Sequence, residues 1–312
     1  RNVTRATSVL MVDYSCAIRL STSISVISAM LEASNRNVLV KGGKYLEAVK
    51  DADVIVFDKT GTLTNANPQV QKVTPLNGYS RDEVLRIAAC LEEHFPHSVA
   101  NAIVNQAKKE GLVHEEEHAK VEYIVAHGIA TTLHGLHTVI GSDHFIFEDD
   151  GVEKTQELED IITLLEKDGA GSLIYLAIDN QVAGIISIYD PLKQEAKQVI
   201  HELKNLGIQK VVMLTGDCNN AAKAVANELD LDDYRSSILP EGKASYIQSL
   251  KDEGHTVIMV GDGINDTPAL STANVSISMQ DSSDLARELA DVTLVSSNLN
   301  ELVTLRKLSV LV

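Results

Sequence analysis

A short apolar run that ends in a carboxylate constrains the fold more than any other feature of this chain. Residues 54–57 are Val-Ile-Val-Phe, and Asp58, Lys59, Thr60 and Gly61 follow directly. A continuous apolar run rich in β-branched residues predicts a strand that is buried on both faces of a parallel sheet. Ligands of open parallel sheets bind beyond the carboxyl ends of the strands, so we expect Asp58 at a ligand-binding edge. Gly61 would let the following loop fold back closely.

Two later segments repeat the pattern of an apolar run, a small residue and an acid. Residues 211–217 are Val-Val-Met-Leu-Thr-Gly-Asp, and residues 257–266 are Val-Ile-Met-Val-Gly-Asp-Gly-Ile-Asn-Asp. Between them, residues 240–243 are Pro-Glu-Gly-Lys and begin a predicted helix. Carboxylates that converge on one point can hold Mg²⁺, which prefers oxygen ligands. The sequence therefore predicts a site at which Mg²⁺, Lys243 and the Thr215 hydroxyl offset the charge of a transferring phosphoryl group.

Asp58 has two possible interpretations from its local sequence. An isolated Asp after a strand most often caps a turn, and we would prefer that interpretation if the segment stood alone. A carboxylate at a strand end, with Lys59 beside it, is also suited to nucleophilic attack on a phosphoryl group, which forms an aspartyl-phosphate. Because three apolar runs end in acid-bearing loops, we favour the second interpretation.

Three segments of the chain resemble the motifs of the P-type ATPase family. They are Asp-Lys-Thr-Gly-Thr-Leu-Thr at residues 58–64, Thr-Gly-Asp at residues 215–217 and Gly-Asp-Gly-Ile-Asn-Asp-Thr-Pro at residues 261–268. The first and last are long and highly specific, their order is that of the family, and the resemblance extends over nearly the whole chain. It implies a haloacid-dehalogenase-like phosphorylation domain into which a nucleotide-binding domain is inserted.

The resemblance also implies roles for individual residues at the predicted site. Asp58 would be phosphorylated by ATP, Thr215 and Lys243 would hold the phosphoryl group, and Asn265 and Asp266 would support the site. The implied catalytic residues are Asp58, Lys59, Thr60, Thr215, Gly216, Asp217, Lys243, Asn265 and Asp266. The implied Mg²⁺ ligands are the carboxylates of Asp58 and Asp262 and the backbone carbonyl of Thr60.

The expected architecture is α/β, with a doubly wound parallel sheet and an inserted α+β domain made of an antiparallel sheet flanked by helices. We assign residues 41–66 and 186–298 to the phosphorylation domain. Residues 67–185 form the insertion, because a stretch of this length is too long for a loop. Residues 1–40 are expected to be a remnant of a membrane helix and a linker, and residues 299–312 the start of the next membrane segment.

Local signals predict several elements of the insertion. Ser-Arg-Asp-Glu at residues 80–83 is a helix capping box. His134-Gly135 and Asp179-Asn180 each separate two apolar runs and predict β-hairpins. No Walker A loop occurs within residues 67–185, which excludes that mode of phosphate binding.

The nucleotide site is predicted from the resemblance alone. Heavy-metal P-type ATPases have a His-Pro pair that opens a helix, and His97-Ser98 is the best match, with Ser in place of Pro. The segment His94 to Pro96 is an alternative match, and a surface or packed histidine is the alternative role for His97. Of the family's Gly-x-Gly motif only Gly128 is kept. The implied ATP-contacting residues are His97, Ser98, Gly128, Gly141 and Ser142.

The order of motifs before the first strand resembles the heavy-metal branch of the family. That branch has a Cys-Pro-Cys-type membrane motif shortly before a Lys-Gly-Gly, and here Ser15-Cys16 precedes Lys41-Gly42-Gly43. Only Cys16 remains as a soft ligand for a transported metal, and a small packed residue is its alternative role. The lost cysteine weakens an assignment to copper and leaves zinc, manganese or cobalt open.

Composition sets further limits. The formal net charge of −17 argues against general binding to nucleic acid, which needs a basic surface. Three scattered cysteines form neither a disulfide framework nor a CxxC site, which indicates a reducing compartment. No stretch contains the roughly 18 consecutive apolar residues of a membrane span. We interpret the chain as the cytoplasmic part of a longer, multi-pass membrane protein whose other membrane and actuator domains would be its partners.

The expected function is therefore ATP-driven transport of a heavy-metal cation through an aspartyl-phosphate. The first alternative is a soluble haloacid-dehalogenase-like phosphatase. General acid catalysis in that class uses an Asp two positions after the nucleophile, and Thr60 occupies that position here. The second alternative is a nucleotide-binding regulatory module without chemistry, which the presence of all the acids disfavours.

Overall fold

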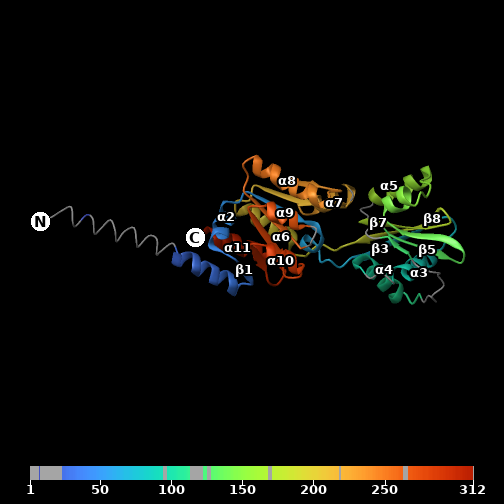
Figure 1. The fold of residues 1–312 in the computed structure, drawn as a ribbon, viewed down its shortest axis with the longest axis horizontal. Helices are drawn as coiled ribbons and strands as arrows, with labels where there is room; N and C mark the ends of the chain where they lie inside the picture. The colour runs from blue at the N-terminus through green and yellow to red at the C-terminus, as the bar shows by residue number, and fades with distance from the viewer. Residues whose placement is uncertain are drawn as a thin grey trace. The chain divides into compact units, whose positions relative to one another are not determined.

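The structure is a computed structural model that describes residue 7 and residues 23–93, 97–112, 122–124, 128–167, 171–217, 219–262 and 266–311. The chain forms two compact units (Figure 1). Unit 1 comprises Arg1–Leu63, Lys193–Gly216 and Ala226–Val312. Unit 2 comprises Thr64–Leu192 and Asp217–Val225.

Unit 1 is built on a largely parallel sheet. Across the sheet the strands are β1 (Val38–Val40), β13 (Val292–Leu294), β12 (Val275–Met279), β11 (Val257–Gly261), β2 (Val54–Asp58), β9 (Lys210–Leu214) and β10 (Asp233–Arg235). All neighbours are parallel except β1 and β13. Every residue of β2, β11 and β12 is buried, as their continuous apolar sequences require. The predicted doubly wound parallel sheet is confirmed.

Helices cover both faces of this sheet. A helix over residues 23–35 precedes β1, and the others are α2 (Gly43–Asp51), α6 (Ala196–Asn205), α8 (Pro240–Asp252), α9 (Thr267–Thr272), α10 (Asp284–Leu289) and α11 (Asn300–Val310). Helix α7 (Asn219–Glu228) is divided between the units, with its residues up to Val225 in unit 2. Apolar side chains of α8 and α9 pack on β2, β9 and β11 in one core cluster. Right-handed crossovers place α6 on the opposite face from α8, because the chain crosses the sheet in opposite directions at these helices. α11 packs against α2 and α6.

Unit 2 is an antiparallel sheet with helices on both faces. The strands lie in the order β3 (Gln69–Pro75), β8 (Gln181–Tyr189), β7 (Ser172–Ile178), β6 (Leu136–Gly141), β5 (Gly128–Leu133) and β4 (Glu122–Ile124). The helices are α3 (Arg81–Glu92), α4 (Ser98–Lys109) and α5 (Gln156–Lys167). α3 and α4 pack on one face and α5 on the other (Figure 1). The predicted α+β architecture is confirmed for this unit.

The helix cap and the two hairpin turns predicted in unit 2 are present. Ser80 and Glu83 form a reciprocal capping box at the start of α3. The β5–β6 hairpin turns at His134-Gly135, with φ of +50° and +83°, and the β7–β8 hairpin turns at Asp179-Asn180, with φ of +49° and +61°. Positive φ at both central residues matches the right-handed twist of the strands.

Several elements were not anticipated from the sequence. β1 and β10 have only three residues each, and β3 is polar and mostly exposed, so none of them carries a strong strand pattern. β1 extends the unit 1 sheet to residue 38 through its antiparallel pairing with β13. Among the residues that the structure describes, no helix has the length and apolar character needed to cross a membrane.

Candidate active site at the carboxyl edge of the unit 1 sheet

The three predicted acid-bearing strands are neighbours in the centre of the sheet. β2 lies between β11 and β9, with Phe57 opposite Val260 and Asp58 opposite Leu214. Because these strands are parallel and in register, the loops after them open at the same edge. Carboxylate oxygens of Asp58, Asp262 and Asp266 all lie within 4.8 Å of one another. The structure therefore brings together acids that are far apart in the sequence.

Lys243 joins two of these acids. Its Nζ lies 2.6 Å from Asp58 Oδ1 and 2.7 Å from Asp266 Oδ1, and all three side chains are buried. α8 presents Lys243 from its first turn, which Pro240 begins. Packing of α8 on β11 and α9 holds this turn over the acids. The ammonium therefore occupies a fixed position beside the proposed nucleophile.

The loop after Asp58 passes close to Asp262. Gly61 has φ of +72°, and a β-carbon built on it would lie 1.6 Å from Asp262 Oδ2. Only glycine allows both this backbone conformation and this approach. Lys59 is half-buried and Thr60 is exposed in the same loop.

The other sequence-predicted residues lie on the β9 loop or outside the described residues. Thr215 is buried, and its backbone N–H donates to the carbonyl of Arg235 at 3.0 Å. Gly216 is exposed and Asp217 is half-buried. Asn265 and Cys16 lie outside the residues that the structure describes.

The electrostatics of the cluster favour a bound cation. Burial raises the pKa of Asp58, repulsion by Asp266 adds to the rise, and Lys243 opposes it. Burial also raises the pKa of Asp262, to about 6, with Asp266 as the next cause. Burial lowers the pKa of Lys243, but attraction to Asp58 and Asp266 outweighs burial, so the net pKa is raised. Three carboxylates converge beside Lys243, with Lys193 as a further positive charge that acts on Asp262, and a hard divalent ion such as Mg²⁺ fits this set of oxygen donors.

In unit 2 the predicted nucleotide residues fall into two groups. Gly128 and Gly141 are paired across β5 and β6, and Ser142 Oγ accepts from the Phe145 N–H at 3.4 Å. A β-carbon on Gly128 would lie 2.2 Å from the Phe145 ring, so the backbone at this point has room for glycine alone. His97 forms the second group, where it caps α4 by accepting from the Ala100 N–H at 3.3 Å.

Glu92 is a residue that the sequence analysis missed. It is the last residue of α3, only 4% exposed, and its Oε2 lies 3.3 Å from His97 Nε2. Hydrogen bonding to Glu92 raises the pKa of His97, and partial burial opposes this effect. The available signal was a carboxylate on the side of α3 that otherwise carries buried residues such as Ala88 and Ala89.

Asp190 is a second such residue. Its Oδ2 accepts from the Thr64 hydroxyl at 2.6 Å, and its Oδ1 accepts from the Asn67 N–H at 3.0 Å. The adjacent backbone is paired too, through an antiparallel bridge between Thr64 and Leu192. Asp190 thus fixes the chain six residues after Asp58, an effect that only tertiary structure reveals.

Comparison with known proteins agrees with the geometry of the site. Residues 52–274 match the family model described as haloacid dehalogenase-like hydrolase. The chain is 36% identical over 309 residues to the zinc-exporting P-type ATPase of Mycobacterium marinum, and this alignment covers 98% of this chain and 42% of that protein. It is 35% identical over 310 residues to the manganese-exporting P-type ATPase of Mycobacterium leprae, an alignment that covers 99% of this chain and 42% of that protein. It is 36% identical over 292 residues to the copper-exporting P-type ATPase of Staphylococcus aureus, an alignment that covers 94% of this chain and 35% of that protein.

Solved structures give the same result. A zinc-transporting PIB-type ATPase in its E2.Pi state aligns with a TM-score of 0.74 and 34% identity, over 94% of this chain and 47% of that one. The catalytic domain of the CPx-ATPase CopB-B aligns with a TM-score of 0.72 and 28% identity, over 89% of this chain and 98% of that one. The chain spans less than half the length of the curated relatives it matches. By its match over residues 52–274 the chain belongs to the haloacid dehalogenase-like hydrolase family, and its relatives within that family are heavy-metal P-type ATPases.

Proposed function

We propose that this chain is the ATP-binding and phosphorylated part of a heavy-metal transporter. The observation that carries the proposal is the cluster of buried Asp58, half-buried Asp262 and buried Asp266, with Lys243 at hydrogen-bond distance from the first and last. A phosphatase of the same family is not favoured, because the relatives are P-type ATPases and Thr60 stands where a phosphatase has its general acid.

In the proposed reaction a carboxylate oxygen of Asp58 attacks the γ-phosphorus of ATP. An O–P bond forms to Asp58, the bond from the γ-phosphorus to the β,γ-bridging oxygen breaks, and ADP leaves with that oxygen. Lys243 holds Asp58 in place and offsets the negative charge of the phosphoryl oxygens, to which Thr215 would also donate.

Mg²⁺ completes the proposed site. When bound, the ion would neutralise phosphoryl charge as a Lewis acid, held by the carboxylates of Asp58 and Asp262 and the carbonyl of Thr60. Asp266 keeps Lys243 oriented toward Asp58 through its own 2.7 Å contact. Burial of the cluster excludes water from the nucleophile and strengthens each of these interactions.

ATP binding is assigned to unit 2. The nucleotide would approach the end of the β5–β6 pair, where Gly128 is half-buried and paired with Gly141, and where Ser142 directly follows β6. His97 and Ser98 lie exposed at the start of α4, where a ligand can reach them. Glu92 orients the His97 ring from the buried side. Supporting evidence comes from the CopB-B catalytic domain, which undergoes conformational changes upon nucleotide binding.

The proposal for the whole protein is export of a metal ion across the membrane in which it would reside. The relatives are named for zinc, manganese and copper, so the cargo would belong to this class, in which cobalt is a further candidate. Cys16 would be one ligand on the transport path. ATP, the metal ion and the remaining membrane and actuator domains are the proposed partners.

The test compares two variants of the full-length protein. Asp58→Asn should abolish the hydroxylamine-sensitive phosphoprotein formed from ATP and leave the nucleotide dissociation constant unchanged. Asp252→Asn, at the exposed end of α8, is the control and should leave both unchanged. If Asp58→Asn weakened nucleotide binding as strongly as it reduced phosphoprotein formation, the assignment of phosphorylation to unit 1 and ATP binding to unit 2 would be wrong. Hydrolysis of a generic phosphomonoester at a rate exceeding ATP turnover would support the phosphatase instead.

A further inference from the structure

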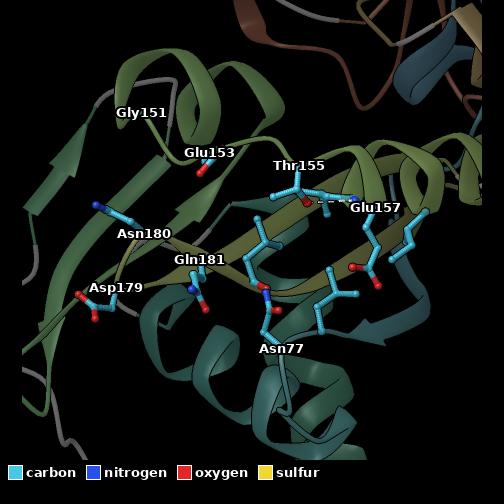
Figure 2. A pocket seen from close by; sticks show the side chains of 12 residues that line it. Asn77, Gly151, Glu153, Thr155, Glu157, Asp179, Asn180 and Gln181 are labelled. Atoms are coloured by element: carbon cyan, nitrogen blue, oxygen red, sulfur yellow. Dashed lines mark hydrogen bonds between the residues drawn. The ribbon is translucent and has the colours of Figure 1, made fainter.

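Between the β7–β8 turn and the segment leading into α5, the surface of unit 2 has a pocket (Figure 2). Its carboxylates, on Glu153, Glu157 and Asp179, are exposed to solvent, and its apolar lining packs in a core cluster. These are features of an ordinary solvated surface, so the pocket indicates no ligand. In unit 1, by contrast, contacts join the candidate active site to a motif that the proposed function does not use.

That motif is Lys41-Gly42-Gly43, which connects β1 to α2. The Lys41 backbone N–H donates to the carbonyl of Asp291 at 2.9 Å. Its Nζ donates to the carbonyl of Arg287 at 3.3 Å and to the carbonyl of Glu288. Both of these carbonyls lie in the last turn of α10, where a helix leaves carbonyls without partners of its own. Lys41 therefore holds the C-terminal end of α10.

The opposite end of α10 is joined to the candidate active site. Ser283 is the N-cap of α10, and its backbone N–H donates to the carbonyl of Asp262 at 3.1 Å. The Ser282 hydroxyl donates to the carbonyl of Gly261 at 3.5 Å, and α10 also packs against α9, which begins directly after Asp266. With six residues, α10 is only about 9 Å long, so a shift of one end moves the other. Lys41 thus acts on the backbone beside two of the three acids.

Gly43 joins the same motif to the helix over residues 23–35. A β-carbon on Gly43 would lie 2.3 Å from Cγ1 of Val26, so glycine lets this helix lie directly on the start of α2. Ala29 and Ala33, on the same face of the helix, are buried, and their small side chains bring its backbone close to unit 1. Because these contacts are close, a movement of the helix displaces the motif.

We propose that Lys41 is a positioning residue that couples the helix over residues 23–35 to Asp262. This inference rests on the proposed function, in which Cys16, shortly before this helix, is a ligand of the transported metal and Asp262 is a ligand of Mg²⁺. Metal binding shifts the helix, the contact at Gly43 passes the shift to Lys41, and α10 carries it to Asp262. Coupling between two sites is reciprocal, so the acid cluster acts on the transport segment through the same contacts.

The test compares Lys41→Met with Lys44→Met in the full-length protein. Lys44 is the matched control, because it is also exposed and its ammonium lies over the Tyr45 ring rather than on α10. The first measurement is the ratio of phosphoprotein formed from ATP with and without added metal, in which a loss of folded protein cancels. The metal is the one of Zn²⁺, Mn²⁺, Co²⁺ and Cu⁺ that stimulates the wild-type protein. The second measurement, which does not depend on activity, is hydrogen–deuterium exchange of residues 284–289 with and without the same ion.

We expect the stimulation ratio to fall about fivefold in Lys41→Met, within the range by which residues between two sites change their coupling. Lys41→Arg, which keeps a cationic donor, should restore most of it, and Lys44→Met should leave it unchanged. The ion should change the exchange of α10 in the wild type and in Lys44→Met, but not in Lys41→Met.

Gly43→Ala is a second test that does not depend on the folding of Lys41→Met. Its β-carbon would push the helix off α2 and should lower the stimulation ratio as well. Adding Val26→Ala removes the clashing Cγ1 and leaves an ordinary contact of 3.6 Å to the Val26 β-carbon, so the double variant should recover the ratio.

A wild-type ratio in Lys41→Met, an equal loss in Lys44→Met, or exchange of α10 that does not respond to the metal in the wild type would overturn the coupling role. A wild-type protein that forms phosphoprotein without stimulation by any of the four ions would overturn it too, while phosphorylation at Asp58 would still stand. Absence of phosphoprotein from the wild type would instead contradict the proposed function, and the inference with it.

Discussion

A β-carbon on residue 61 would lie 1.6 Å from Oδ2 of Asp262, so Gly61 and Asp262 adjoin each other at a distance that only glycine permits. Gly61 also has φ of +72°, in the left-handed region that other residues rarely adopt. The close approach of these two loops sets the spacing between Asp58 and Asp262 at the candidate site.

Gly61→Ala should therefore impair both stability and phosphorylation. The left-handed conformation costs an added side chain about 1 kcal/mol, and displacement of Asp262 should bring the total loss of unfolding free energy to about 2–4 kcal/mol. Displacement of the acids by about 1 Å should lower the rate of phosphoprotein formation about a hundredfold. Urea unfolding and rapid-quench phosphorylation measure the two effects.

Gly254→Ala separates backbone strain from the steric clash. Gly254 has φ of +94°, but a β-carbon there meets no atom within 4 Å. This control should lose only about 1 kcal/mol of unfolding free energy and keep its phosphorylation rate. If the two variants behave alike, contact with Asp262 does not matter.

Lys243→Met should destabilise unit 1, because it leaves the buried carboxylates of Asp58 and Asp266 without their cation. Breaking a buried ion pair by removing one partner typically lowers the unfolding free energy by about 3–5 kcal/mol. In an Asp266→Asn background the same substitution should cost at least about 1 kcal/mol less, because fewer charges are left unpaired. A double-mutant cycle in urea checks this. Identical losses in both backgrounds would show that Lys243 and Asp266 are not coupled.

The central strands of unit 1 and their acid-bearing ends could be predicted because each strand is a continuous apolar run, a signal that depends on local sequence alone. Grouping of Asp58 with Asp262 followed from the rule for parallel sheets. The contacts of Lys243 depend on how α8 packs over β11 and could not be derived from sequence. Glu92 was missed for a similar reason, because its role comes from a contact with His97 at the start of the next helix, which the sequence does not reveal.

The interaction of Glu92 with His97 should depend on pH. Since Glu92 raises the pKa of His97, its contribution to stability is present below the ordinary pKa of about 6.5 and disappears as pH rises through the raised value. Glu92→Gln should lower the pKa of His97 in an NMR titration. It should also destabilise unit 2 more at about pH 6 than at about pH 8.

Glu93→Gln is the control for this prediction. Glu93 is exposed and pairs with Lys108, so its substitution should leave the pKa of His97 unchanged. A downward shift of equal size in Glu93→Gln would mean that general surface charge, rather than contact with Glu92, sets the pKa of His97.

Arg306 should be essential for the stability of unit 1. From α11 its guanidinium donates to the carbonyls of Val49 and Lys50, in the last turn of α2, and of Leu206, at the end of α6. The side chain is buried, so Arg306→Met would leave these carbonyls unsatisfied and lower the unfolding free energy by about 2–4 kcal/mol. Lys307→Met, at an exposed ion pair, should change it by less than about 1 kcal/mol. Similar losses in the two variants, measured by urea unfolding, would contradict this role.

The central claim is that Asp58 carries the phosphoryl group, and chemical trapping tests it most directly. The full-length protein is incubated with ATP, Mg²⁺ and a candidate metal, quenched in acid and reduced with borohydride, which converts an aspartyl-phosphate to homoserine. Mass spectrometry of the digested protein should find homoserine at position 58 and at no other aspartate, in an amount that depends on ATP. Homoserine at a different position, or none despite ATP hydrolysis, would contradict the account.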